Sequence, residues 1–192
     1  SSAASDVYKR QSAFDIVCKN DKVYMIIGGK DLLNGKRFDK GGYILTYDYD
    51  KWSFIDPKEA QKKLNLPRNP RDYTSIAVTT DDSNDEIVYA SSMGDGVIQY
   101  KNGTPVQSYN EKNAFKETAG GYGSGYCYID GLAFDKNGNL WMTSSEVNHA
   151  VLVLDKAGAW HRLDIEQLRG VYTINDILIT LSLIHISEPT RH

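Results

Sequence analysis

Hydrophobic and polar residues alternate along most of the chain in short runs that are separated by turn residues. The clearest stretch is residues 129–164, which contains the runs GLAF, NLWMTS, HAVLVLD and WHRLD. The turns around Asn137-Gly138 and Ala157-Gly158 supply the positive-φ positions that tight hairpins need. This alternation predicts four consecutive antiparallel strands.

The same four-run pattern recurs along the chain. Residues 73–110 contain TSIAVT, EIVYASS, DGVIQYK and PVQSYN, and residues 14–56 contain FDIVCK, KVYMII, GYILTYD and WSFID. The first copy carries the insertion KDLLNGKRFDK between its middle runs, and a fourth copy begins within residues 173–180. Four short strands repeated at this length are typical of a β-propeller blade.

We therefore predict an all-β fold, a partial β-propeller of four-stranded antiparallel blades with about three and a half blades present. A β-sandwich is the alternative, since it also uses alternating short strands. The recurring turns and large aromatic residues favour the propeller. One set of residues occupies the same place in all three copies, and two further sets do so in two copies: Val23-Tyr24-Met25, Ile87-Val88-Tyr89 and Leu140-Trp141-Met142; Ser91-Ser92 and Ser144-Ser145; Trp52 and Trp160.

The tryptophans Trp52, Trp141 and Trp160 are expected to pack between blades. A short helix is expected in DPKEAQKKLNL, where Asp56 can cap the N-terminus, Pro57 suits the first helical position and Glu59 completes a capping box. Residues 165–169 can form one further turn before Gly170, and a loop rich in glycine and tyrosine, residues 111–128, joins the second copy to the third.

Both ends of the chain match a translated sequencing adapter. Ser5 to Gln11 can be encoded by TCAGATGTGTATAAGAGACAG, and codons for Leu181 to Ser187 can begin CTGTCTCTTATACACATCT, its reverse complement over nearly the whole length. We interpret residues 1–11 and 181–192 as adapter-derived and exclude them from fold reasoning. Residues 12–180 are then the partial β-propeller, and neighbouring domains, a leader peptide or a membrane anchor can be missing from it.

Without those ends, Lys plus Arg falls from 22 to 19 and Asp plus Glu from 25 to 23, so the net charge is about −4. This balance gives no indication of nucleic-acid binding. No apolar run approaches the roughly 20 residues that span a bilayer, so no membrane segment is expected. Cys18 and Cys127 lack metal-ligand spacing and are interpreted as small buried apolar residues.

The second and third copies resemble the two-component-regulator propeller family of Bacteroidetes, and especially its PorZ-type members associated with type IX secretion. The third copy carries this resemblance in GLAFD, NLWM and Gly158-Ala159-Trp160. The second copy carries it in ASSMGDGV and in Tyr109-Asn110-Glu111-Lys112-Asn113, where the following residue is Ala114 in place of the usual serine. The likeness covers residues 73–180 well and the first copy loosely.

The resemblance implies a periplasmic or cell-surface protein with tandem propellers, which binds a ligand or partner and is not an enzyme. It implies secretion-system proteins, a glycan or lipopolysaccharide as partners, and no cofactor. One alternative is the periplasmic sensor propeller of a hybrid two-component system that detects glycans. A second alternative is a propeller enzyme similar to streptogramin lyase, whose chemistry needs a histidine and metal-binding carboxylates converging at the axis.

Candidate binding residues lie in the loop between the second and third copies. Tyr122 and Tyr126 can stack on sugars while their hydroxyl groups stay in water, whereas Tyr128 is a candidate for the core. We predict no catalytic residue and no metal ligand. Asp135, Asn137 and Asn139 fit a hairpin turn better than a calcium loop, which wants glycine where Leu140 stands. The two remaining histidines, His149 and His161, are interpreted as ordinary solvated residues.

Overall fold

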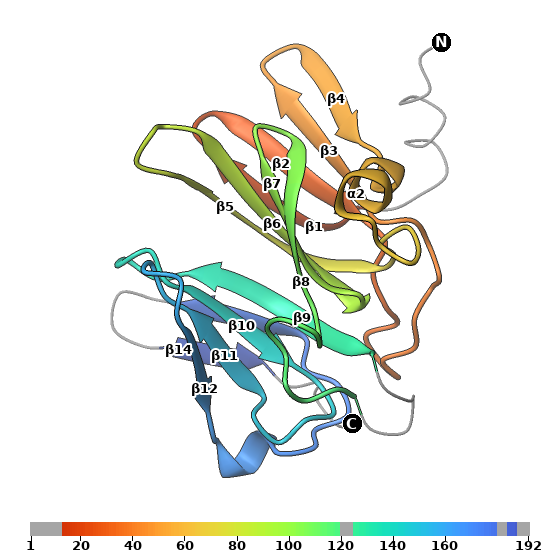
Figure 1. Cartoon of the computed structure of the whole chain (residues 1–192), viewed down its shortest axis with the longest axis vertical. Coiled ribbons are helices and arrows are strands. Elements are labelled where there is room, and N and C mark those ends of the chain that lie inside the picture. The colour runs from red at the N-terminus through yellow and green to blue at the C-terminus, as the bar shows by residue number, and fades with distance from the viewer. Residues whose placement is uncertain (1–12, 120–124, 180–183, 188–192) are drawn as a thin grey trace.

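The computed structural model describes residues 13–119, 125–179 and 184–187. The first blade is a four-stranded antiparallel sheet in the order β1-β2-β3-β4 (Figure 1). Its strands are β1 (Ala13–Lys19), β2 (Lys22–Ile27), β3 (Tyr43–Asp48) and β4 (Lys51–Ile55). Each strand pairs with its sequence neighbour, as expected for strands joined by hairpins.

The second and third blades have the same strand order. The second blade consists of β5 (Tyr73–Thr80), β6 (Glu86–Gly94), β7 (Gly96–Lys101) and β8 (Thr104–Tyr109). The third consists of β9 (Cys127–Phe134), β10 (Leu140–Ser144), β11 (Val151–Leu154) and β12 (Trp160–Leu163). The end of β6 also pairs with the start of β9, through Met93 opposite Tyr128 and Gly94 opposite Cys127, so the two blades form one eight-stranded sheet.

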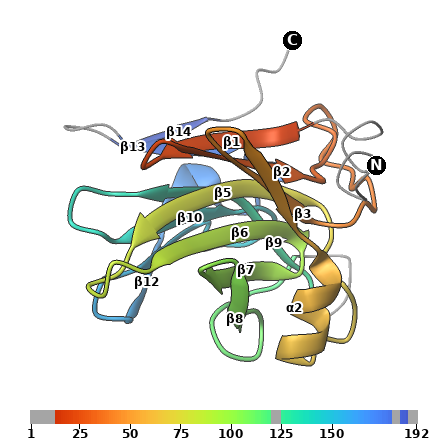
Figure 2. The same cartoon turned by 90° about the horizontal axis from the view of Figure 1, so that it is seen from above.

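The first strands of successive blades, β1, β5, β9 and β13 (Asp176–Ile179), pack side by side, and the later strands of each blade fan outward (Figures 1 and 2). This arrangement confirms the prediction of an all-β, partial β-propeller-like fold. Strand β13 pairs with β14 (Ile184–Ser187), which lies within the segment predicted to be adapter-derived. That origin stays a prediction.

A register irregularity recurs where the first two strands of each blade meet, and it aligns the blades independently of residue type. It occurs opposite Ile27 in the first blade, Ser92 in the second and Ser144 in the third. This alignment corrects the sequence prediction, because it shifts the second copy by one residue. In a strand, a slip of one residue exchanges the two faces of the sheet.

With the corrected register, Tyr24, Tyr89 and Trp141 become equivalent. Each lies in the second strand of its blade and packs toward the following blade or its leading segment. Tyr24 is buried with residues of the second blade, Tyr89 packs on the third blade, and Trp141 packs on Leu168 and Ile174. Trp141 thus packs between the third blade and the segment that leads to β13, and a large aromatic residue recurs at this position in all three blades.

Trp52 and Trp160 occupy the opposite face, which points toward the preceding blade. Trp160 packs on Tyr109 and Phe115, with ring centroids 5.5 Å and 5.4 Å away, and so lies between the second and third blades as predicted. Trp52 stacks on Tyr47 of its own blade and is 46% exposed. The prediction that Trp52 packs between blades is therefore wrong for the described chain, because no described blade covers this face.

The two cysteines also differ in burial. Cys127 is buried at the start of β9, and burial raises the pKa of its thiol to about 12. Cys18 lies on the uncovered face of β1 and is exposed, which contradicts the prediction that both cysteines are buried. Both thiols are free, so these cysteines do not form a disulfide.

The helix predicted after the first blade is α2 (Pro57–Leu64), which packs beside β8 (Figure 2). The side chain of Asp56 accepts a hydrogen bond from the Lys58 N–H at 2.9 Å, so the predicted N-cap is confirmed. The backbone N–H of Glu59 donates a hydrogen bond to the Asp56 carbonyl oxygen at 3.0 Å. The second expected turn is the 3₁₀ helix η1 (Glu166–Leu168).

Two apolar cores fill the spaces between blades, one between the first and second blades and one between the second and third. The loops that leave β2, β6 and β8, together with helix α2, gather at one end of the blades (Figures 1 and 2). Short hairpins occupy the other end. Residues from three blades therefore meet at the first end, and we call it the loop end.

Candidate binding site

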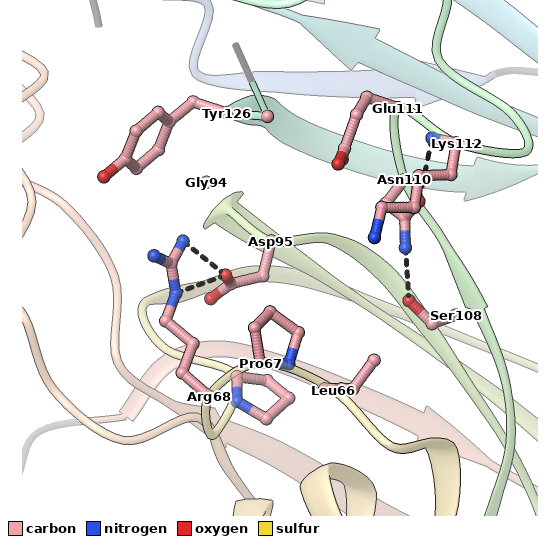
Figure 3. A pocket seen from close by; sticks show the side chains of 12 residues that line it. Leu66, Pro67, Arg68, Gly94, Asp95, Ser108, Asn110, Glu111, Lys112 and Tyr126 are labelled. Carbon is pink, nitrogen blue, oxygen red and sulfur yellow. Dashed lines mark hydrogen bonds and ion pairs between the residues drawn. The ribbon is translucent and has the colours of Figure 1, made fainter. Parts of the chain in front are cut away.

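A pocket of about 300 Å³ opens at the loop end (Figure 3). Its walls come from the segment after α2, the turn between β6 and β7, and the loop that leads from β8 to β9. The lining residues are Leu66, Pro67, Arg68, Pro70, Gly94, Asp95, Ser108, Asn110, Glu111, Lys112, Gly125 and Tyr126. We call it the three-segment pocket.

Asp95 organises one wall of this pocket. It sits in a tight turn between Gly94 (φ 130°) and Gly96 (φ 80°), where a Cβ on Gly96 would lie 2.1 Å from the Tyr109 carbonyl oxygen. Glycine is required there because an L side chain would clash with backbone. The Asp95 carboxylate accepts hydrogen bonds from Arg68 Nε at 2.8 Å and from the Arg71 N–H at 3.1 Å. The turn is thereby fixed to the segment after α2.

Tyr126 lies where that wall meets the loop from the second blade. The guanidinium groups of Arg37 and Arg68 lie 5.1 Å and 5.4 Å from its ring centroid. Burial acts to lower the pKa of Arg68, but the charge and hydrogen bond of Asp95 outweigh burial, and the net pKa is raised. The ring of Tyr126 therefore interacts with two cations.

The two predicted binding tyrosines have different outcomes. Tyr126 lines the three-segment pocket, and its role in binding stays a prediction. Tyr122 lies outside the described residues. Tyr128 is buried, as its candidacy for the core implied, and its ring packs edge-on against Tyr126 at 6.3 Å.

The opposite wall carries two charged residues that were not predicted as site residues. Glu111 is half-buried and Lys112 is exposed, and neither forms an ion pair with any described residue. Asn110 shapes this wall, because its side chain accepts from the Lys112 N–H at 2.9 Å and donates to Ser108 Oγ at 3.2 Å. Figure 3 shows Glu111 facing Asp95 across the pocket. The sequence signal for this wall is the element Tyr109–Asn113, which is one of the motifs that carry the family resemblance.

A buried ion pair lies beneath the loop end, where the inner strands come together. Lys30, from the loop after β2, pairs with Asp130 in β9, and both side chains are almost completely buried. The Lys30 ammonium also donates to Thr173 Oγ1 at 2.9 Å and to the Ile174 carbonyl oxygen at 2.8 Å. Burial raises the pKa of Asp130, although Lys30 and Ser145 oppose this increase. The pair ties the first blade to the third and to the segment before β13.

The other polar motifs form local structures. Asp135 accepts from the backbone N–H groups of Asn137 and Asn139 and from the Trp141 indole, which confirms the predicted hairpin turn. His149 pairs with Glu117, and His161 pairs with Asp155 at 2.7 Å. Both histidines are partly exposed, in line with the prediction of solvated residues. Within residues 13–119 and 125–179, no group of three or more His, Cys, Asp or Glu side chains is arranged to hold a metal ion.

A second hollow lies between the second and third blades, toward the hairpin end. This groove of about 670 Å³ is lined by the aromatic rings of Tyr89, Tyr109, Phe134 and Trp160. Asp82 and Lys156, one from each blade, form an ion pair of 3.5 Å at the groove.

In the part of the chain that the structure describes, no helix is long and apolar enough to cross a membrane.

No protein-family model and no curated protein sequence matches this chain. Among solved structures, the chain is similar to PorZ, described as an essential bacterial surface component of the type IX secretion system of Porphyromonas gingivalis. The TM-score is 0.72 over 89% of this chain, at 20% sequence identity. The chain spans 22% of the length of that PorZ chain. The similarity establishes a PorZ-like fold.

Proposed function

We propose that this chain belongs to a PorZ-like, extracytoplasmic protein that contributes to type IX secretion at the cell surface and acts by binding. The fold similarity to a surface component of that secretion system supports this proposal. Within it, secretion-system proteins are the proposed protein partners. The proposal assigns the chain a binding role and no catalytic step.

The three-segment pocket is the proposed binding site, and a glycan, such as the polysaccharide of lipopolysaccharide, is the proposed ligand. The observation that carries this assignment is that one pocket is lined both by Glu111 and Lys112 and by the Arg68–Asp95 pair. A hydroxyl-rich ligand needs closely spaced donors and acceptors, together with apolar walls that exclude water. Leu66, the neighbouring prolines and Tyr126 supply those walls.

The pocket assignment predicts that Glu111→Ala and Lys112→Ala each weaken binding to purified lipopolysaccharide polysaccharide by about tenfold, which corresponds to about one hydrogen bond to a charged group. Both side chains lack an ion-pair partner among the described residues, so their removal is expected to leave folding intact. Isothermal titration calorimetry on the full chain measures the affinity, and thermal melting checks the fold.

Glu166→Gln is the matched control, because Glu166 is an exposed carboxylate in η1, outside the pocket. It is expected to bind the polysaccharide like the unmodified chain. Equal affinity for the unmodified chain and both pocket variants would show that the pocket does not hold the glycan.

The glycan-sensor alternative would use the same pocket, and it differs in the domains that the propeller is joined to. The lyase-like alternative needs a histidine and metal-binding carboxylates that converge at the axis. In the described part of the chain, His149 and His161 each pair with a single carboxylate, and the Lys30–Asp130 pair lies where the inner strands meet. No specific observation therefore favours the lyase over the binding role.

A further inference from the structure

The insertion between β2 and β3 exposes apolar side chains to an unusual degree. Leu33 is 92% exposed, and Leu32 and Phe38 are each 47% exposed. Leu33 has the highest exposed fraction among the large hydrophobic residues of the described chain. Contiguous exposed apolar residues on a soluble domain commonly mark an interaction surface.

Hydrogen bonds hold this loop in one shape. The Asp31 N–H donates to the Lys36 carbonyl oxygen at 2.8 Å, and the Asp31 carboxylate accepts from the Leu33 N–H and from the Asn34 side chain, each at 2.8 Å. Gly35 (φ 66°) closes the turn. The loop begins at Lys30, whose ammonium is buried against Asp130. The leucines are thus displayed by an anchored, internally bonded turn.

Tyr172, from the segment before β13, extends the apolar surface beside the loop. A Cβ on Gly35 would lie 3.3 Å from Tyr172 Cε1, so the tyrosine ring reaches the base of the turn. Tyr172 is 52% exposed. Tyrosine is enriched where proteins meet the boundary between membrane and water, because its ring is apolar and its hydroxyl is polar.

Positive charge exceeds negative charge in residues 31–40, which carry Lys36, Arg37 and Lys40 against Asp31 and Asp39. Lys36 and Lys40 are exposed, and neither forms an ion pair within residues 13–119 and 125–179. Of the two acidic groups, Asp39 pairs with Arg71 at 3.0 Å, and Asp31 accepts hydrogen bonds from neutral donors within the turn and keeps its charge. An apolar tip bordered by unpaired lysines is complementary to acyl chains beneath anionic headgroups.

We propose that residues 31–40, together with Tyr172, form a docking surface for a lipid membrane with anionic headgroups. Leu32 and Leu33 enter the boundary between headgroups and acyl chains, and Lys36 and Lys40 contact the phosphates. Leu33, at 92% exposure, protrudes from the turn and is not enclosed by a pocket, which suits insertion at such a boundary better than a protein hot spot, whose anchors fill closed pockets.

This docking surface goes beyond the proposed glycan binding and has a consequence for its geometry. Arg37, in the same loop, lies over Tyr126 of the three-segment pocket. Docking through the loop therefore brings the loop end, and with it the pocket, close to the membrane surface.

Sedimentation of the full chain with vesicles tests the proposal. We expect binding to vesicles of phosphatidylcholine and phosphatidylglycerol in equal parts, and weaker, salt-insensitive binding to phosphatidylcholine alone. Leu33→Asp is expected to weaken vesicle binding by about tenfold or more, since it removes an inserted side chain and adds a negative charge. Val106→Asp is the matched control, because Val106 is an exposed apolar residue on β8, and it is expected to bind like the unmodified chain.

A second variant, Leu33→Trp, reports insertion directly. The chain already contains Trp52, Trp141 and Trp160, so the emission of the unmodified chain is subtracted; the difference spectrum is expected to shift to shorter wavelength when anionic vesicles are added, because the introduced indole leaves water. Absence of binding to both vesicle types, equal binding of the Leu33→Asp variant and the unmodified chain, or an unshifted Leu33→Trp spectrum would each overturn the proposal. If the loop binds a protein partner instead, the chain is expected to bind neither vesicle type.

Discussion

Replacing Lys30 by methionine is expected to lower the free energy of unfolding by about 3–5 kcal/mol at neutral pH. The change removes the positive partner of Asp130 and leaves a buried carboxylate without a counter-charge. It also removes the donor for Thr173 Oγ1 and the Ile174 carbonyl oxygen. Because these groups come from different blades, the loss is expected to loosen the first blade from the third.

The cost of Lys30→Met is expected to depend on pH. Burial already holds the pKa of Asp130 above its ordinary value of 3.8, and loss of Lys30 raises that pKa further. A carboxyl group with a raised native pKa binds more protons in the folded state than in the unfolded state. The stability of the variant therefore falls as the pH rises from about 4 through the native pKa, and the deficit relative to the unmodified chain is smallest in acid.

Urea denaturation between pH 4 and pH 8 measures this dependence. Lys36→Met is the matched control, because Lys36 is an exposed lysine in the same loop, and its stability is expected to change by less than about 0.5 kcal/mol. Adding Asp130→Asn to Lys30→Met should recover part of the loss at pH 8, since no buried charge remains. A Lys30→Met deficit that is independent of pH would show that Asp130 is not the group left uncompensated.

The equivalent tryptophans of the first and third blades give the second large expected effect. Trp160→Ala is expected to lower the free energy of unfolding by about 3 kcal/mol, because it empties the contact with Tyr109 and Phe115 between two blades. Trp52→Ala is expected to cost about 1 kcal/mol or less, since Trp52 is 46% exposed and its truncation removes less buried apolar area.

Parallel thermal and urea unfolding of the two variants measures this difference. Trp52 thus serves as the matched control for Trp160, with the same residue type at the same place in the repeat. Equal losses of stability would contradict the conclusion that the two faces differ in cover. Trp52→Ser is further expected to reduce aggregation of the chain, because it removes an exposed aromatic side chain from a face of the first blade that also carries Ile16, which is 57% exposed.

Much of the fold follows from local sequence patterns. The alternation in GLAF, NLWMTS and HAVLVLD predicts strands because a half-buried strand has a period of two residues. Asp56 and Pro57 predict the start of α2 because a helix N-terminus needs a side-chain acceptor and tolerates proline. Such signals act over a few residues and can be recognised without knowing the rest of the fold.

The equivalence of the blades was predicted only in part. Shared residue types aligned the first and third copies correctly, but the second copy was placed one residue away from its observed register. Runs such as EIVYASS contain apolar residues on both faces of the strand. An alignment that is shifted by one residue therefore matches apolar positions almost as well as the observed one. The irregularity opposite Ser92 decides the register, and it is a property of strand pairing.

The candidate site depended on tertiary structure for a related reason. An aromatic loop residue such as Tyr126 can be recognised from the sequence, whereas Glu111 and Lys112 become candidates only because the fold places them in one pocket with Arg68 and Asp95. Lys30 and Asp130 are 100 positions apart, and nothing near either residue indicates the other. Their contact exists because the inner strands of separate blades converge.

The sequence alone therefore determined the strands, the turns, the helix cap and the repeat, because each depends on neighbouring residues. Only the tertiary structure decided which face of each blade is covered, how the second copy aligns, and which charges meet at the loop end. Those features depend on packing between blades, and such packing brings together residues that are far apart in the chain.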